Sequence, residues 1–293
     1  MGYLHISNLY ADQRILLFRE CFALEKVHGT SAHVALRDGS LRLSPGGASA
    51  KAFEACFDTG ALAAALRSTG HESIIVYGEA YGGKEQAQAW RYGPSLRFVA
   101  FDVTLGDGWL PVPEAEAFCK RVGLEFVHYR RVPTDLDALD AERDAPSEQA
   151  HRNGVEGDRH REGVVLRPIV ECSMGGERVI AKHKRDDWRE TATPRKVVDP
   201  AQLQVLRDAE AIALEWVTDT RMEHVVDHLR ARGIVLGPAA TKAVIDEMIA
   251  DVVREGRLEI VDSPEARKAI GSRAARLFKV WQAKANRRHQ GEP

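Results

Sequence analysis

The pattern of apolar residues changes near residue 195, and this change limits the folds that the chain can adopt. Before it, short runs of β-branched and aromatic residues, such as residues 73–80, alternate with turns. After it, apolar residues recur at steps of three and four, as in residues 212–229. The first pattern is typical of strands and the second of amphipathic helices. The sequence therefore predicts an α+β protein with an antiparallel-sheet domain over residues 1–195 and a small all-helical domain over residues 196–293.

Turn and cap residues divide the first part further. Asp38-Gly39 lies between two alternating runs and predicts a hairpin with a two-residue turn. Helices are expected over residues 51–67, with Gly60 as a candidate break, and over residues 113–123. Residues 133–160 are polar and lack apolar periodicity, so we expect a mobile surface excursion there.

Composition is typical of a soluble globular protein, with 44% hydrophobic and 29% charged residues. The four cysteines are scattered without a C-x-x-C pair, which is typical of cytosolic proteins with free thiols. No apolar run approaches the ~20 residues of a membrane span. The formal net charge is −2, so any surface for nucleic acid must be local. Residues 264–293 carry eight Lys or Arg against two acids, which predicts either a phosphate-binding stripe or an ordinary solvated helix.

Polar residues interrupt the predicted strands at five places. These are residues 25–30, 77–79, 101–102, 162–163 and 182–184. Each has an ordinary structural explanation: Lys26 at a strand end can extend to water, Phe101 can belong to the core, and Lys182 with Lys184 can form a solvated edge. The five together supply a richer chemistry than any one of them.

That chemistry is covalent transfer of a nucleotide. A lysine amine attacks phosphorus only when uncharged, which desolvation or neighbouring cations favour. Lys26 is the candidate nucleophile, and Lys182 and Lys184 supply cations that also bind phosphate oxygens. Glu79 and Glu162 offer oxygen ligands for a divalent metal or a ribose hydroxyl. An aromatic face at Phe101 suits a purine, and a glycine at position 29 lets the backbone approach a ligand.

At this point the sequence resembles the covalent nucleotidyltransferases, which comprise DNA ligases, RNA ligases and mRNA capping enzymes. "EKVHGT" is similar to their Lys-x-x-Gly attachment motif, and "VYGEAYGG", "FVAFDV", "EGVVLRP" and "VIAKHK" follow in the family's order over residues 20–185. Within that superfamily the chain most resembles the RNA ligase 2 family, because His28 precedes the motif glycine and because a helical region follows the catalytic domain.

The resemblance implies a role for each matching residue. Lys26 would form the lysine–AMP bond, Glu79 would contact ribose, Phe101 would stack on adenine, and Glu162 would assist a metal. Implied as catalytic are Lys26, His28, Lys182 and Lys184; as nucleotide-binding, Glu25, Lys26, Gly29, Arg42, Glu79, Phe101, Asp102, Glu162, Lys182 and Lys184; and as RNA-binding, Arg221, Glu247 and Asp251.

Two positions depart from the family pattern. Ser31 stands where asparagine is common, and Pro45 lies near the position of a family arginine. Arg42 and Arg37 are the candidates to replace that arginine.

We therefore expect an ATP-dependent RNA ligase that uses Mg²⁺ or Mn²⁺ and joins RNA 3′-hydroxyl and 5′-phosphate ends at duplex nicks. The enzyme is expected to be a cytoplasmic monomer that does not associate with membranes. Two alternatives stay open: a DNA ligase or capping-type enzyme, which a β-barrel after residue 200 would favour, and a nucleic-acid-binding protein with a degenerate ligase fold.

Overall fold

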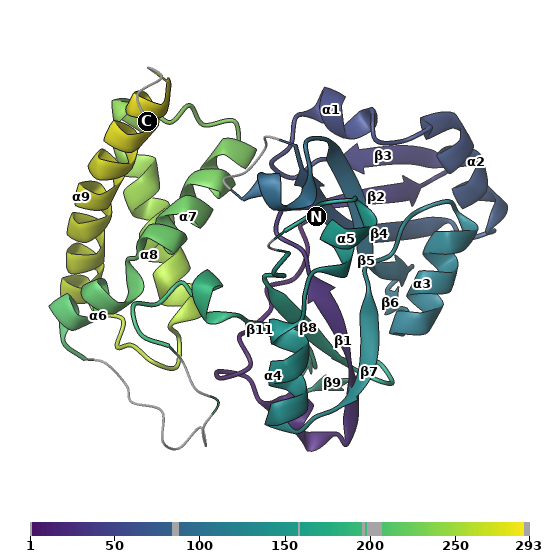
Figure 1. Ribbon diagram of the computed structural model, residues 1–293, viewed down its shortest axis with the longest axis horizontal. Coiled ribbons are helices and arrows are strands. Elements are labelled where there is room, and N and C mark those ends of the chain that lie inside the picture. The colour runs from purple at the N-terminus through teal and green to yellow at the C-terminus, as the bar shows by residue number, and fades with distance from the viewer. Residues whose placement is uncertain (1, 84–87, 158, 195–196, 198–206, 290–293) are drawn as a thin grey trace. The chain divides into compact units, whose positions relative to one another are not determined.

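The chain divides into two compact units, Met1–Arg185 and Asp186–Pro293 (Figure 1). The structure is a computed structural model that describes residues 2–83, 88–157, 159–194, 197 and 207–289, without the side chains of 286–289. Residue 195, where the sequence predicts the domain boundary, lies outside the described residues.

The first unit is built on two antiparallel sheets. One sheet has the order β11-β8-β1-β7, with β11 (Ala181–Lys184), β8 (Gly163–Pro168), β1 (Glu20–Lys26) and β7 (Tyr129–Pro133). The other has the order β3-β2-β4-β5-β6, with β3 (Ser40–Ser44), β2 (Thr30–Arg37), β4 (Ser73–Gly82), β5 (Leu96–Leu105) and β6 (Gly108–Trp109). A short hairpin adds β9 (Ser173–Met174) and β10 (Glu177–Arg178). The predicted α+β class is confirmed.

The predicted hairpin is present with the predicted turn. Asp38 and Gly39 connect β2 to β3, and their φ values are 50° and 71°. A two-residue turn with both φ values positive matches the twist of the flanking strands, and Asp-Gly is among the pairs that adopt it most readily.

The pairing of β4 with β5 contains a bulge. Tyr77 lies opposite Asp102 and Gly78 opposite Ala100, so Phe101 is the extra residue of β5 at this point. A bulge of this kind bends the strand and redirects the side chain of the extra residue.

Helices α1 (Ala50–Glu54), α2 (Thr59–Ser68) and α3 (Val112–Arg121) pack on the larger sheet and share its apolar core. The single predicted helix over residues 51–67 is interrupted, but not at Gly60. The break precedes Asp58, whose side chain accepts a hydrogen bond from the Ala61 N–H at 3.0 Å and caps α2. A polar cap therefore determines this boundary rather than glycine flexibility.

The prediction of a mobile excursion over residues 133–160 is wrong. This segment contains α4 (Leu136–Asp144) and α5 (Glu148–Arg152), each with a side-chain cap at its N-terminus. Contacts of α4 with β1, β7, β8 and β11 place it on the smaller sheet. Among the side chains that the two helices bury are Glu142 and Gln149, and polar buried residues leave no apolar periodicity to detect.

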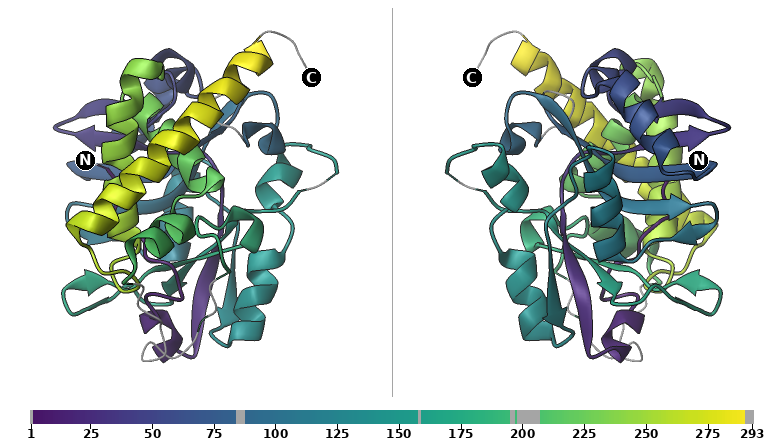
Figure 2. Two further views of the ribbon diagram at one scale, coloured as in Figure 1. Left: turned by 90° about the vertical axis from the view of Figure 1, so that its left-hand side faces the viewer. Right: turned by 90° about the vertical axis from the view of Figure 1, so that its right-hand side faces the viewer.

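Helices joined by short loops make up most of the described residues of the second unit. Its long helices are α6 (Ala209–Trp216), α7 (Asp219–Ala231), α8 (Thr241–Glu255) and α9 (Pro264–His289). Helix α9 packs against α6 and α8 (Figure 2), and Ser263 caps it by accepting a hydrogen bond from the Ala266 N–H at 3.1 Å. The expected apolar stripe is buried at Ile212, Val225 and Leu229, whereas Leu214 is 55% exposed. Within the described part of the chain, no helix has the length and apolar character required to cross a bilayer.

Candidate active site

Strand register brings two of the predicted lysines to opposite sides of one glycine. Lys26 pairs with Gly163 across β1 and β8, and Gly163 pairs with Lys184 across β8 and β11. Directly paired residues project from the same face of a sheet, so the two lysines flank a position without a side chain. A Cβ on Gly163 would lie 2.2 Å from the His183 carbonyl oxygen, and the φ of +152° is one that other residues rarely adopt. Glycine is therefore required here by the close approach of the β11 backbone.

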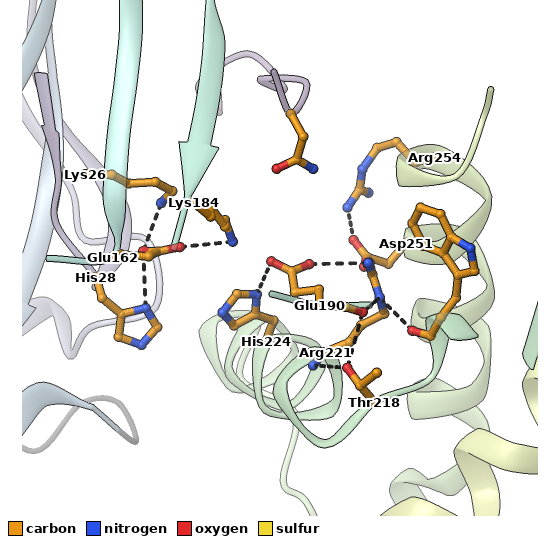
Figure 3. Close-up of polar contacts among 12 residues, drawn as sticks. Lys26, His28, Glu162, Lys184, Glu190, Thr218, Arg221, His224, Asp251 and Arg254 are labelled. Carbon is orange, nitrogen blue, oxygen red and sulfur yellow. Dashed lines mark hydrogen bonds and ion pairs between the residues drawn. The ribbon is translucent and has the colours of Figure 1, made fainter. Parts of the chain in front are cut away.

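The carboxylate of Glu162 holds both lysines. Its Oε2 lies 3.1 Å from Lys26 Nζ, and its Oε1 lies 2.9 Å from Lys184 Nζ. The same Oε2 lies 3.6 Å from Nδ1 of His28 (Figure 3). The side chain of Glu162 is only 2% exposed, whereas that of Lys26 is 23% exposed. The Lys26 side chain is thus held by an ion pair at its amine and is still partly exposed to solvent.

Charge is distributed unequally between the two acids of the site. Burial would raise the pKa of Glu162, but the charges of Lys184 and Lys26 outweigh burial and hold that pKa well below its usual range. Burial raises the pKa of Glu79 to about 8, although the charge of Lys26 acts in the opposite direction. At neutral pH Glu162 is ionised and Glu79 is largely protonated. Two lysines then face one carboxylate, and the excess positive charge suits an anionic ligand.

The segment "EKVHGT" over residues 25–30, here called motif I, packs closely against β4. A Cβ on Gly29 would lie 2.4 Å from the Ala80 carbonyl oxygen and 2.7 Å from Cγ of Glu79, so only glycine allows this approach. The N–H of His28 donates a hydrogen bond to the Tyr92 hydroxyl at 3.1 Å, and Tyr92 is fully buried. The loop between β1 and β2 is therefore held from two sides.

Two other predicted residues lie on β11 and β5. Lys182 lies two positions before Lys184 on β11, so both lysines share one face. Phe101 is partly buried at the bulge in β5, next to the apolar core. Their proposed contacts with phosphate and adenine stay predictions.

The side chain of Glu25 lies outside the cluster. Successive side chains of β1 alternate between faces, and the Glu25 carboxylate accepts hydrogen bonds from the Ser147 hydroxyl and from the N–H groups of Glu148 (2.9 Å) and Gln149 (3.2 Å). These groups form the N-terminus of α5, which favours a negative charge. The structure thus assigns this carboxylate to helix capping, and a nucleotide contact by Glu25 stays a prediction.

Asp102 also serves another network. Its buried carboxylate lies 2.9 Å from Nη1 of Arg167 and 2.5 Å from Nη1 of Arg178, and it accepts a hydrogen bond from the Tyr3 hydroxyl at 2.6 Å. The side chain is 0% exposed. With these partners the carboxylate has a structural role in the strand-rich unit, and a nucleotide contact by Asp102 stays a prediction.

Arg42 is exposed on β3 opposite Ala35, toward the hairpin turn. The Thr30 hydroxyl accepts a hydrogen bond from the Gly47 N–H at 2.8 Å, so the chain just after Pro45 is what lies beside motif I. This geometry does not support Arg42 as the replacement for the family arginine.

The three predicted RNA-binding residues pair with other side chains of the helical unit. Arg221 is 2% exposed and contacts Asp251, which also pairs with Arg254. Glu247 lies 2.7 Å from Nδ1 of His228. A buried guanidinium with a carboxylate partner joins α7 to α8. RNA contact by Arg221, Glu247 and Asp251 stays a prediction.

Sequence reasoning missed several residues that shape the site. Tyr92 and Ser147 hold motif I, and Tyr3, Arg167 and Arg178 surround Asp102. Arg167 lies within the matching run "EGVVLRP" but is assigned no role by the resemblance, and the other four residues lie outside the five matching runs. The only available signal is the occurrence of two arginines in runs otherwise typical of buried strands.

The donor set fits a nucleotide better than a metal held by protein alone. Among residues 2–83, 88–157, 159–194, 197 and 207–289, no three His, Cys, Asp or Glu side chains gather as a metal site would require. Glu162 and Glu79 are the carboxyl groups of the cluster, and Mg²⁺ commonly binds through one or two carboxylates plus phosphate oxygens and water. Lys26 and Lys184 flank Gly163 and supply two ammonium groups, which are hydrogen-bond donors of the kind that phosphate oxygens accept from.

Comparison with known proteins agrees with this geometry. The family model described as RNA ligase matches residues 19–184. No curated protein matches the chain. The solved structure of Naegleria gruberi RNA ligase with PPi is 14% identical with a TM-score of 0.50, and the match covers 64% of this chain and 57% of that one. The same figures hold for two mutants of that ligase, one with ATP and Mn and one with AMP and Mn.

At 14% identity the solved structures show the fold alone, and the chain spans 57% of the Naegleria ligase. The family model is more informative, because it covers more than half of the chain and every strand from β1 to β11. Since the strands that carry Lys26, Gly163 and Lys184 all lie inside that match, the chain belongs to the RNA ligase family.

Proposed function

We propose that the protein is an ATP-dependent RNA ligase that joins RNA 3′-hydroxyl and 5′-phosphate ends through a lysine–AMP intermediate on Lys26. The observation that carries this proposal is the placement of Lys26 and Lys184 on either side of Gly163, both bound by Glu162. Membership in the RNA ligase family and the likeness to a ligase solved with ATP, AMP and Mn support it.

In the first step the uncharged Lys26 amine attacks the α-phosphorus of ATP. The N–P bond forms, the bond from the α-phosphorus to the bridging oxygen breaks, pyrophosphate leaves, and the amine gives up a proton. Lys184, with Lys182 on the same strand face, stabilises the charge on the phosphate oxygens. Glu162 holds Lys26 in place before ATP arrives, and its ion pair must loosen as the amine loses its charge.

In the second step an oxygen of the RNA 5′-phosphate attacks the phosphorus of lysine–AMP. The P–N bond breaks, Lys26 regains a proton, and the RNA end carries AMP. In the third step a 3′-hydroxyl attacks the activated RNA phosphate, the phosphodiester forms, and AMP leaves. The protein contributes mainly by positioning the ends and stabilising charge.

A divalent ion, Mg²⁺ or Mn²⁺, would neutralise charge on the phosphates during these steps. Glu162 is the residue proposed to hold it, with Glu79 next to it and with the remaining ligands supplied by phosphate and water. The high pKa of Glu79, about 8, also leaves a proton that can be donated to a ribose hydroxyl.

The helical unit distinguishes this proposal from the DNA ligase and capping alternatives. Those enzymes carry a β-barrel after the catalytic domain, whereas the described residues from 207 onward form helices. The charged residues of the Glu162 cluster also argue against a degenerate, non-catalytic ligase fold.

The helical unit is proposed to engage RNA. Lys268, Arg276 and Lys279 are exposed on α9 at spacings of eight and three residues, which places them along one stripe. Arg287 and Arg288 lie outside the residues whose side chains the structure describes. The proposal includes nicked RNA duplexes as substrate and a cytoplasmic monomer as the working form.

The first test is to incubate the protein with ATP labelled at the α-phosphate and to map the labelled residue by mass spectrometry. We expect an acid-labile label on Lys26 in the wild type and none in Lys26→Ala. Lys120→Ala, which removes an exposed lysine from α3, is the matched control and should label normally.

The second arm measures sealing of a nicked RNA duplex. Lys26→Ala should fail with a 5′-phosphate end and ATP, yet seal an end that already carries AMP, because the third step does not need the nucleophile. Label on a different lysine would refute the proposal. Equal sealing of 5′-phosphate ends by the wild type and by Lys26→Ala would also refute it. Preferential sealing of an all-DNA nick would favour the DNA ligase alternative.

A further inference from the structure

A short N-terminal segment contacts two of the strands that carry the proposed nucleotide site. We call Tyr3–Leu9 the N-terminal strap. At one end the Ser7 carbonyl accepts a hydrogen bond from the Lys182 N–H at 2.9 Å, and the Leu9 N–H donates to the Lys182 carbonyl at 2.8 Å. Leu9 is 1% exposed, so this end is buried against the unit. The strap therefore adds a short parallel pairing to the outer edge of β11.

The other end of the strap reaches β5. The Tyr3 ring packs edge-on against the Phe101 ring, with 4.9 Å between centroids, and lies 5.1 Å from the Tyr77 ring. The Tyr3 hydroxyl donates a hydrogen bond to Oδ2 of Asp102 at 2.6 Å. One side chain thus holds two consecutive residues of the strand, at the point where the strand leaves regular pairing.

The two residues that Tyr3 contacts differ in how firmly the rest of the protein holds them. Asp102 is anchored by Arg167 and Arg178. Phe101 is the extra residue of the bulge and has no paired residue on β4. A ring at a bulge owes its orientation to its packing neighbours rather than to strand register. Tyr3, fixed by its hydroxyl to a buried carboxylate, is such a neighbour.

We propose that Tyr3 is a positioning residue for the nucleotide site, which it serves by holding the Phe101 ring in the orientation that stacks on adenine. The inference rests on the proposed function, since it takes ATP as the ligand. It deepens that function by assigning part of the purine site to a segment that precedes the first strand. Tyr3 acts through Phe101 and does not itself touch the nucleotide.

The test separates the purine end of the ligand from its phosphates. Equilibrium binding of ATP and of inorganic tripolyphosphate is measured by calorimetry on full-length protein carrying Lys26→Ala, so that no covalent bond forms. In this background Tyr3→Ala should weaken ATP binding by about two- to tenfold, the range expected for loss of an edge-to-face aromatic contact. Tripolyphosphate binding should stay unchanged, because it uses the lysines alone.

Companion variants keep the test decisive. Tyr3→Phe retains the ring and should bind ATP more tightly than Tyr3→Ala, and Tyr10→Phe removes a hydroxyl from the same region and should match the parent. If Tyr3→Ala does not fold, Tyr3→Leu replaces it, since leucine keeps apolar bulk without an aromatic edge. Unchanged ATP binding, or an equal loss of ATP and tripolyphosphate binding, would overturn the inference and leave a purely structural strap.

The two possible failures are distinguishable. If the wild type forms no lysine–AMP and the Lys26→Ala parent does not bind ATP, the proposed function is refuted and the inference with it. If the wild type is labelled at Lys26 while the Tyr3 variants bind ATP like the parent, only the role of Tyr3 is refuted.

Discussion

Replacing Asp102 with asparagine is expected to destabilise the strand-rich unit. The Asp102 carboxylate is 0% exposed and lies within 2.9 Å of Arg167 and 2.5 Å of Arg178, whose side chains are 1% and 8% exposed. Asparagine keeps the shape but removes the charge, so each of the two buried guanidinium groups loses one carboxylate partner and keeps its contact with Glu171. The Arg178 Nη2 has no hydrogen-bond partner and its Nε keeps Glu171 at 2.8 Å, so the loss falls on Nη1, which lies 2.5 Å from Asp102.

The expected loss of stability follows from the burial of these ion pairs. Removing one partner of a buried ion pair costs about 3–5 kcal/mol. For a domain of this size each kcal/mol lowers the unfolding midpoint by about 2–4 °C, so Asp102→Asn should lower it by roughly 6–20 °C. Asp107→Asn is the matched control, because Asp107 is exposed in the turn that follows β5 and should change stability by less than about 0.5 kcal/mol.

The assay is thermal unfolding followed by circular dichroism and calorimetry, with ATP binding measured well below the midpoint. We expect a lowered midpoint and ATP binding close to that of the wild type. An unchanged midpoint together with lost ATP binding would refute this reasoning. That result would support the direct nucleotide contact that the sequence resemblance implies for Asp102.

Two further predictions concern other ion pairs. Burial opposes the ionised form of Glu162, but the charges of Lys184 and Lys26 hold the pKa of this carboxyl well below the ordinary value of 4.5. The ion pairs of Glu162 therefore stabilise the folded protein fully above about pH 4.5, and this stabilisation is lost as the pH falls toward the folded-state pKa. Glu162→Gln should remove this part of the acid dependence, which urea unfolding between about pH 3 and pH 6 measures; identical slopes in both proteins would contradict the pairing. Arg221→Ala should destabilise the helical unit by about 3–5 kcal/mol, because it leaves Asp251 without its buried partner, while lysine labelling persists. Unchanged unfolding with weakened RNA binding would instead support Arg221 as an RNA contact.

Local chemistry explains what the sequence alone could predict. The turn at Asp38-Gly39 depends on residues adjacent in the chain, and it is found as expected. The change to helical spacing near residue 195 predicted the helices of the second unit. The ordered motifs around Lys26 and Lys184 indicated the RNA ligase family, which the family model shows.

Failures of sequence reasoning share one physical cause. Helices α4 and α5 are stabilised by side-chain caps and bury polar residues, so an apolar period could not reveal them. Glu25 lies within the attachment motif, but the direction in which its side chain points is decided by strand alternation and by the helix N-terminus at Ser147. The bulge that frees Phe101 depends on how β4 and β5 pair.

Tertiary structure alone decided which charges meet. Lys26 and Glu162 are separated by 136 positions in the sequence and by 3.1 Å in the fold. No local preference encodes that pairing; it follows from the register of β1 and β8, which places Gly163 beside Lys26. The sequence determined which reactive groups the protein has, and the packing of distant strands determined which of them act on one another, because electrostatic interactions depend on distance in space and not on order in the chain.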